Sequence, residues 1–146
     1  MPFATAQDFQ DVTHVELRPF FQITCEDAPL ELVAPFGRAT SLIAPALTQI
    51  AYLFIVIGNP PMTVPLEHGS LVFAPHAEVV ALHHHGVIYL NAGALLPLSD
   101  EKKTAVCLEE FVHALMHVRD ETLTTGIVNY LLAKSKGQIS PATSSP

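Results

Sequence analysis

The sequence contains no tryptophan and only two cysteines among its 146 residues. The two cysteines, Cys25 and Cys107, lie far apart and form no CxxC pair. A fold held together by disulfides is therefore excluded, and so is a structural zinc knuckle. Met1–Gln10 has no basic segment followed by an apolar run, so we expect no secretory signal. Together these absences favour a reducing, cytoplasmic location.

Basic residues are also scarce. The chain has 7 Lys plus Arg against 14 Asp plus Glu, and its net charge is −7 with the eight histidines neutral. Phosphate binding needs clustered Lys and Arg, so this balance argues against a nucleic-acid partner. Hydrophobic residues make up 49% of the chain and charged residues 14%, which excludes disorder of the whole chain.

No apolar run is long enough to cross a membrane. The segment Ala39–Leu66 contains no charged residue and no histidine, and Leu42–Ile57 is its most apolar part. This part is shorter than the ~20 apolar residues that a membrane span needs, and Pro45 interrupts it. We expect a buried helix that starts at Thr40 or Ser41 and ends near Ile57, with a membrane-bound or partner-binding helix as the alternative.

The remaining pattern predicts one α+β domain, 1–135, followed by a flexible tail, 136–146, that is rich in Ser, Pro and Gly. We expect a small, mostly antiparallel sheet packed against helices, with the element order β-β-α-β-β-β-β-α-α. The predicted strands are Val15–Thr24, Leu30–Val33, Met62–Leu66, Ser70–Ala74, Glu78–Leu82 and Gly86–Asn91. Val15–Thr24 suits an edge strand because it contains a proline.

Two helices are predicted at the end of the domain. Ser99 is a helix cap followed by two acids, and the helix from Lys102 runs to about Val118. The second helix spans about Glu121 to Lys134, with Gly137 past its end. At ~100° per residue, one face of the first helix gathers polar groups that chemistry can use. These are Glu109, Glu110, His113 and His117, and the same face continues to Asp120 and Glu121.

This polar face has the spacing of a metal site. Glu109 and His113 lie one helical turn apart, and so do His113 and His117. Imidazole and carboxylate groups at this spacing can share one ion. Glu110 lies between them, where a carboxylate can accept a proton from water. The alternative interpretation is the solvated polar face that any amphipathic helix carries.

The segment Gly86–Glu121 resembles the edge strand and active-site helix of zincin-like metallopeptidases, and the minimal zincins are closest in size. Gly86–Asn91 matches the strand along the substrate cleft, and Glu109-Glu110-Phe111-Val112-His113 aligns with the H-E-x-x-H motif. The resemblance implies a zincin-like fold and a divalent metal cofactor, zinc. It also implies that Glu110 is the general base and that His113 is a metal ligand, and the helical spacing makes Glu109 and His117 the candidate co-ligands.

The chain departs from the family at the first ligand position, where Glu109 replaces a histidine. A carboxylate is a harder ligand and lowers the selectivity for zinc. The third ligand stays open among His117, Asp120 and Glu121. The resemblance is therefore compatible with an active, specialised peptidase and with a degenerate relative that has lost catalysis.

Three consecutive histidines, His83-His84-His85, lie just before the matched strand, with His76 upstream. In an extended strand alternate side chains point to opposite faces, so at most two of the three converge. A local turn cluster is the favoured interpretation. In a zincin-like layout, however, this segment borders the substrate cleft.

Two functions follow from the sequence. The first is metal-dependent hydrolysis of a protein or peptide. The second is a non-catalytic interaction or regulatory domain on the same scaffold, which binds a partner or a second copy of itself through apolar surface near residues 39–66.

Overall fold

The computed structural model describes residues 2–74 and 79–137 and confirms an α+β fold. Its centre is a four-stranded sheet in the order β2-β4-β8-β7. Its strands are β2 (Phe21–Cys25), β4 (Leu53–Gly58), β8 (Val87–Asn91) and β7 (Ala81–His84). The sheet is mixed rather than mostly antiparallel, because β2, β4 and β8 are parallel and only the edge strand β7 is antiparallel to its neighbour.

The two central strands are apolar on both faces. Along β4, Ile55 and Ile57 enter the main core, whereas Val56 points to the other side and packs with Tyr89 of β8. This alternation is the period of two that a β-strand imposes on its side chains. A strand buried on both faces reads as a continuous apolar run.

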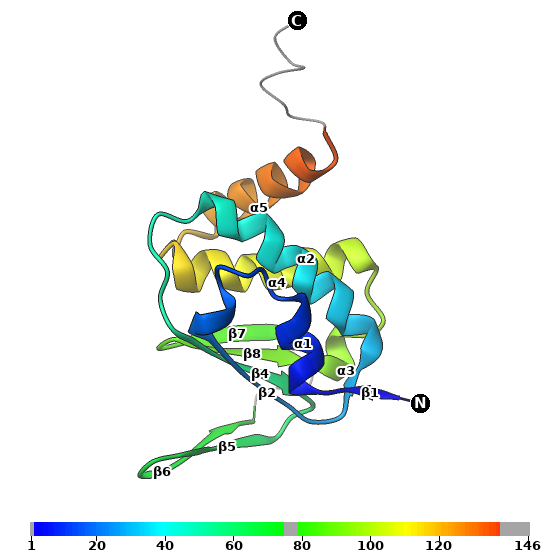
Figure 1. The fold of residues 1–146 in the computed structure, drawn as a ribbon, viewed down its shortest axis with the longest axis vertical. Helices are drawn as coiled ribbons and strands as arrows, with labels where there is room; N and C mark the ends of the chain where they lie inside the picture. The colour runs from blue at the N-terminus through cyan, green and yellow to red at the C-terminus, as the bar shows by residue number, and fades with distance from the viewer. Residues whose placement is uncertain (1, 75–78, 138–146) are drawn as a thin grey trace, which may run out of the picture.

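The helices lie on one side of the sheet (Figure 1). They are α1 (Ala6–Val12), α2 (Val33–Ile43), α4 (Asp100–Leu115) and α5 (Glu121–Ser135), with the short α3 (Ala92–Leu95) after β8. Of these helices, α5 is the one farthest from the sheet (Figure 1). The main core lies between this layer and the sheet, where Phe111 of α4 contacts Phe36 of α2 and Phe21 of β2 at ring-centroid distances of 5.7 and 5.6 Å.

The opposite face of the sheet carries a hairpin formed by β5 (Met62–Leu66) and β6 (Gly69–Phe73). Figure 1 shows this hairpin on the side of the sheet away from the helices. Met62 and Val64 of β5 pack against Val56 and Tyr89 in a second, smaller apolar cluster. The remaining short elements are β1 (Phe3–Ala4), β3 (Ala28–Pro29), which pairs with β1, and the 3₁₀ turns 18–20, 30–32 and 44–46.

The predicted helix from Thr40 to Ile57 is wrong. The helix runs over Val33–Ile43 instead, and Leu53–Gly58 is the central strand β4. Pro35 does not break this helix because it lies in the first turn, where a missing N–H leaves no hydrogen bond unmade. The strand predicted at Leu30–Val33 is also wrong, since Leu30–Leu32 is a 3₁₀ turn that leads directly into α2.

Several other elements agree with the sequence. Ser99 caps α4 by accepting a hydrogen bond from the Lys102 amide, and α5 ends at Ser135, just before Gly137. The strand predicted over Val15–Thr24 forms only from Phe21, as the edge strand β2, because Arg18–Phe20 is a 3₁₀ turn. The strand Gly86–Asn91, by contrast, is internal as β8, and the edge next to it is β7. Most of the predicted tail, 138–146, lies outside the described residues.

Within the described residues, none of the helices combines the length and the apolar character that a membrane crossing requires.

Candidate metal centre

The candidate site is built on the last turns of α4. Glu109 and His113 lie four residues apart on this helix, so their side chains project from the same face one turn apart. The opposite side of the helix holds it in place, because Leu108, Phe111 and Val112 are buried in the main core. The polar face is thereby fixed toward the surface between α4 and the β7–β8 hairpin.

His113 is held in one orientation by a main-chain contact. Its Nδ1 atom lies 2.6 Å from the carbonyl oxygen of Val118, in the segment that follows α4. A carbonyl only accepts hydrogen bonds, so Nδ1 carries a proton and donates it. In the neutral imidazole the lone pair is then on Nε2. A ring whose Nδ1 donates to a main-chain carbonyl and whose Nε2 carries the lone pair is the arrangement found in metal-binding histidines.

Glu121 reaches the same place from the next helix. Asp120 caps α5 by accepting a hydrogen bond from the Leu123 amide at 2.8 Å, so the helix begins at Glu121. Oε1 of Glu121 then lies 3.4 Å from Nε2 of His113. The sequence left Asp120 and Glu121 open as the third ligand. The structure uses the Asp120 carboxylate as a helix cap and brings Glu121 to the site.

Glu109, His113 and Glu121 form a compact set of metal-ligand atoms. One ligand atom of each lies within 4.8 Å of the other two. Two ligands held at tetrahedral positions about 2.1 Å from one ion are themselves about 3.4 Å apart. The distance between Nε2 of His113 and Oε1 of Glu121 is also 3.4 Å. The donor set, one imidazole and two carboxylates, fits a divalent cation that accepts both nitrogen and oxygen ligands.

The surroundings of Glu109, Glu121 among them, favour the protonated form of its carboxyl group. Burial raises the pKa of Glu109, and the negative charge of Glu121 and a hydrogen bond with it raise that pKa further, while His113 lowers it. Two ionised carboxylates in such proximity repel each other unless a proton or a cation lies between them. A bound divalent ion removes this repulsion.

Glu110 lies beside this set and is half-buried. Burial is the main cause that raises its pKa to about 7, and Glu109 and Glu121 act in the same direction, against His113. Without a metal ion this carboxyl is therefore divided between its charged and neutral forms near neutral pH. That property suits a group that accepts a proton and later releases it.

These residues line one open cavity of about 590 Å³. Acidic groups of α4 and α5 meet histidines of the β7–β8 hairpin there, and the loop between α4 and α5 contributes as well. The lining residues are His83, His84, His85, Glu109, Glu110, His113, His117, Val118, Arg119 and Glu121. All three consecutive histidines contribute, although strand alternation predicted at most two. The reason is that β7 ends at His84 and His85 lies in the turn, with a left-handed backbone.

His117 does not lie where the sequence placed it. The predicted helix to Val118 is wrong, because α4 ends at Leu115 and the backbone of His117 is left-handed, with φ of 56°. The side chain therefore leaves the helical face that carries Glu109 and His113. It still lines the cavity, but it lies outside the group of three close ligand atoms.

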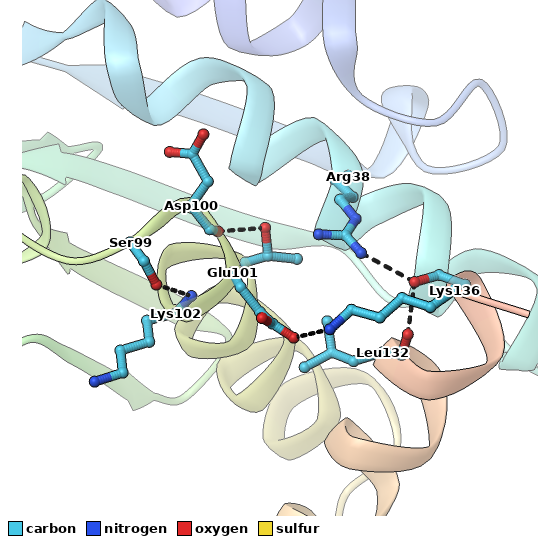
Figure 2. Close-up of polar contacts among 9 residues, drawn as sticks. Arg38, Ser99, Asp100, Glu101, Lys102, Leu132 and Lys136 are labelled. Carbon is cyan, nitrogen blue, oxygen red and sulfur yellow. Dashed lines mark hydrogen bonds and ion pairs between the residues drawn. The ribbon is translucent and has the colours of Figure 1, made fainter. Parts of the chain in front are cut away.

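Polar contacts at the far end of the helices fix α5 against α4. Figure 2 shows Lys136, after α5, paired with Glu101 in the first turn of α4. Arg38 of α2 donates to the hydroxyl of Ser135 at 3.0 Å, and this hydroxyl donates to the Leu132 carbonyl. With one end held in this way, the short loop at the other end sets the position of Glu121 relative to His113.

The sequence did not reveal the role of the Val118 carbonyl, because every residue has a main-chain carbonyl and no residue type marks the one that accepts this hydrogen bond. It also missed Arg119, which lines the cavity from the loop. The favoured interpretation of the histidines as a local turn cluster is confirmed at His85-Gly86, which forms the tight turn between β7 and β8.

The chain was compared with known protein families, with curated proteins and with solved structures, and nothing matches in any of the three comparisons.

Proposed function

We propose that this protein binds one divalent metal ion, zinc, through Glu109, His113 and Glu121 and hydrolyses a peptide bond next to it. The observation that carries the proposal is the arrangement of His113. Its Nδ1 donates to the Val118 carbonyl, its Nε2 lies 3.4 Å from Oε1 of Glu121, and one ligand atom of Glu109 lies within 4.8 Å of those of the other two residues. When bound, the ion supplies a Lewis acid that polarises a carbonyl group and acidifies water.

Glu110 has the role of general base in this proposal. It lies next to Glu109 on α4 and lines the same cavity. Its carboxylate accepts a proton from a water molecule as the water oxygen attacks the carbonyl carbon of the peptide bond. The carbon–nitrogen bond then breaks, and the carboxyl group returns the proton to the leaving amine nitrogen. The half-buried position keeps this carboxyl partly shielded from bulk water.

Zinc is the ion we expect, although one histidine with two carboxylates is a harder set than two histidines with one carboxylate. The affinity order of divalent ions at a mixed nitrogen and oxygen site places Zn²⁺ above Mn²⁺ and Fe²⁺. The short separation between His113 and Glu121 suits the tetrahedral geometry of zinc.

Calorimetric titration of Zn²⁺ into protein purified without a polyhistidine tag and stripped with a chelator tests the metal site. We expect one ion per chain and loss of that ion in His113→Ala. The matched control is His68→Ala, because His68 is an exposed histidine on the β5–β6 hairpin turn. A wild-type protein that takes up no ion contradicts the proposal, as does a His113→Ala variant that binds zinc normally.

Hydrolysis is tested separately with an unstructured, fluorescently labelled casein substrate. We expect zinc-loaded wild type to cleave it and Glu110→Gln to bind zinc without cleaving. Equal cleavage by both proteins excludes Glu110 as the base. Zinc binding without cleavage by the wild type means that the protein holds the ion but is not an active peptidase.

A further inference from the structure

Two histidines with unusual backbone conformations line the same cavity from different elements. His85, in the β7–β8 turn, has φ of 47°, and His117, after α4, has φ of 56°. Asp27 is the third non-glycine residue with positive φ in the described part of the chain, and it does not line this cavity. A side chain in this region costs about 1–2 kcal/mol relative to the ordinary conformation, and glycine removes the cost.

Strained residues of this kind cluster at functional sites, where the surroundings maintain them. Both positions are turn positions that favour glycine, asparagine or aspartate: one opens a tight hairpin turn and the other follows a helix end. The presence of imidazole rather than glycine at both positions therefore points to a use for the ring. Each ring offers an N–H donor to whatever occupies the cavity.

A permanent positive charge lines the same cavity as these rings. Arg119 lines the cavity from the same loop as His117, and no carboxylate of the described residues lies within ion-pair distance of it. A guanidinium group binds carboxylates through two parallel hydrogen bonds. His83 lines the same cavity.

We propose that His85, His117 and Arg119 bind a carboxylate group of the peptide that is hydrolysed at the metal centre. This inference rests on the proposed function and adds a substrate class to it: peptides with a free C-terminal carboxylate or an acidic side chain near the cleaved bond. Glu109 and Glu121 repel such a group while they are ionised, and a divalent cation cancels their two charges. In the wild-type protein, carboxylate binding therefore requires the ion.

The test measures binding calorimetrically with three probes, in the Glu110→Gln background so that nothing is cleaved. The probes are acetyl-Ala-Ala-Ala with a free C-terminus, the same peptide as its C-terminal amide, and acetyl-Ala-Glu-Ala-amide. With zinc bound we expect at least one of the two carboxylate peptides to bind 10-fold or more tightly than the amide. The stronger of the two identifies the source of the carboxylate. Equal affinity for all three probes overturns the inference.

His85→Gly and His117→Gly separate the role of the ring from the role of the fold. Glycine suits both backbone conformations, so we expect melting temperatures no lower than that of the parent protein. The preference for the carboxylate peptide falls at least 5-fold in each variant and also in Arg119→Ala, whereas His68→Gly leaves it unchanged. Unchanged preference in all three variants overturns the assignment of these residues.

A measurement without metal tests the carboxylate site separately from the proposed function. The double variant Glu109→Gln, Glu121→Gln removes the two repelling charges without any ion. We expect it to prefer the carboxylate peptide over the amide, and to lose that preference when His117→Gly is added. If the wild type binds no zinc, the proposed function is wrong, and this variant still decides whether the carboxylate site exists.

Discussion

The imidazole of His113 and the carboxylate of Glu121 belong to different helices, yet their Nε2 and Oε1 atoms lie 3.4 Å apart. Only the five residues between α4 and α5 separate the two helices along the chain. The candidate metal centre therefore joins the end of one helix to the start of the next, and an ion bound there links the two.

This link predicts that zinc stabilises the folded chain. An ion that binds only the folded state adds about 2.7 kcal/mol of unfolding free energy when its free concentration is 100 times its dissociation constant. We expect the melting temperature of the stripped protein to rise on addition of Zn²⁺, and Glu121→Gln to reduce that rise. A rise of equal size in Glu121→Gln and in the control Glu67→Gln, on the hairpin turn, contradicts the assignment of Glu121.

Glu110 predicts a pH dependence of stability in the absence of metal. Its pKa of about 7 in the folded protein exceeds the ordinary value of 4.5, so the folded state holds the proton more tightly. The resulting stabilisation is complete below about pH 4.5 and is lost as the pH rises through 7, with a total of up to about 3 kcal/mol. Denaturant unfolding in a chelator, followed from pH 5 to 8, measures this loss.

The matched variant for this measurement is Glu110→Gln, which cannot ionise. Its stability is expected to fall less over the same pH range, so that at pH 8 the metal-free variant is more stable than the wild type. A slope identical to that of the wild type shows that other groups cause the pH dependence.

Asp120 predicts a coupling between helix capping and metal affinity. Its carboxylate accepts the Leu123 amide and fixes the first turn of α5, where Glu121 lies. Asp120→Ala is expected to cost about 1 kcal/mol of stability. It should also weaken zinc binding about 10-fold, as is usual when a ligand loses its support. Asp120→Asn retains the cap, so thermal unfolding and zinc titration should place it close to the wild type.

Two glycines in helices predict opposite effects of alanine. A Cβ atom at Gly37 of α2 would lie 2.7 Å from the Val12 Cβ and 2.8 Å from the Val12 carbonyl oxygen. Gly37→Ala is therefore expected to cost about 1–3 kcal/mol. At Gly126 of α5 no such neighbour lies within 4 Å, so Gly126→Ala should add about 0.5–1 kcal/mol through helix propensity. Denaturant midpoints of both variants check the pair, and a stabilised Gly37→Ala contradicts the close packing of α1 on α2.

The sequence predicted the elements whose signals are local. Ser99 and the acids after it begin α4, Gly137 follows α5, and the β-branched runs form the β5–β6 hairpin. It failed at Leu53–Gly58, because a strand buried on both faces has no alternation and resembles a buried helix in composition. It failed at α2 for a related reason: Pro35 and Gly37 are helix breakers in general and are tolerated here by position.

The sequence also predicted part of the candidate site and left the rest open. Glu109 and His113 follow from their spacing of four on one helix. The choice of Glu121 over His117 depends on where α4 ends, and helix ends are the least certain feature of a sequence-based assignment. That end is set by the left-handed turn at His117 and by the capping of the next helix, which only the folded chain displays.

The partner that orients His113 is the carbonyl oxygen of Val118, which every amino acid possesses. Replacing the valine side chain therefore leaves this acceptor in the main chain, where it can still accept the hydrogen bond from Nδ1 of His113. Inserting or deleting a residue between Leu115 and Glu121 is different, since it would move the carbonyl, the ring and the second carboxylate out of register at once. The geometry of the candidate centre therefore depends on the length of this connection as well as on the cap that Asp120 forms at its end.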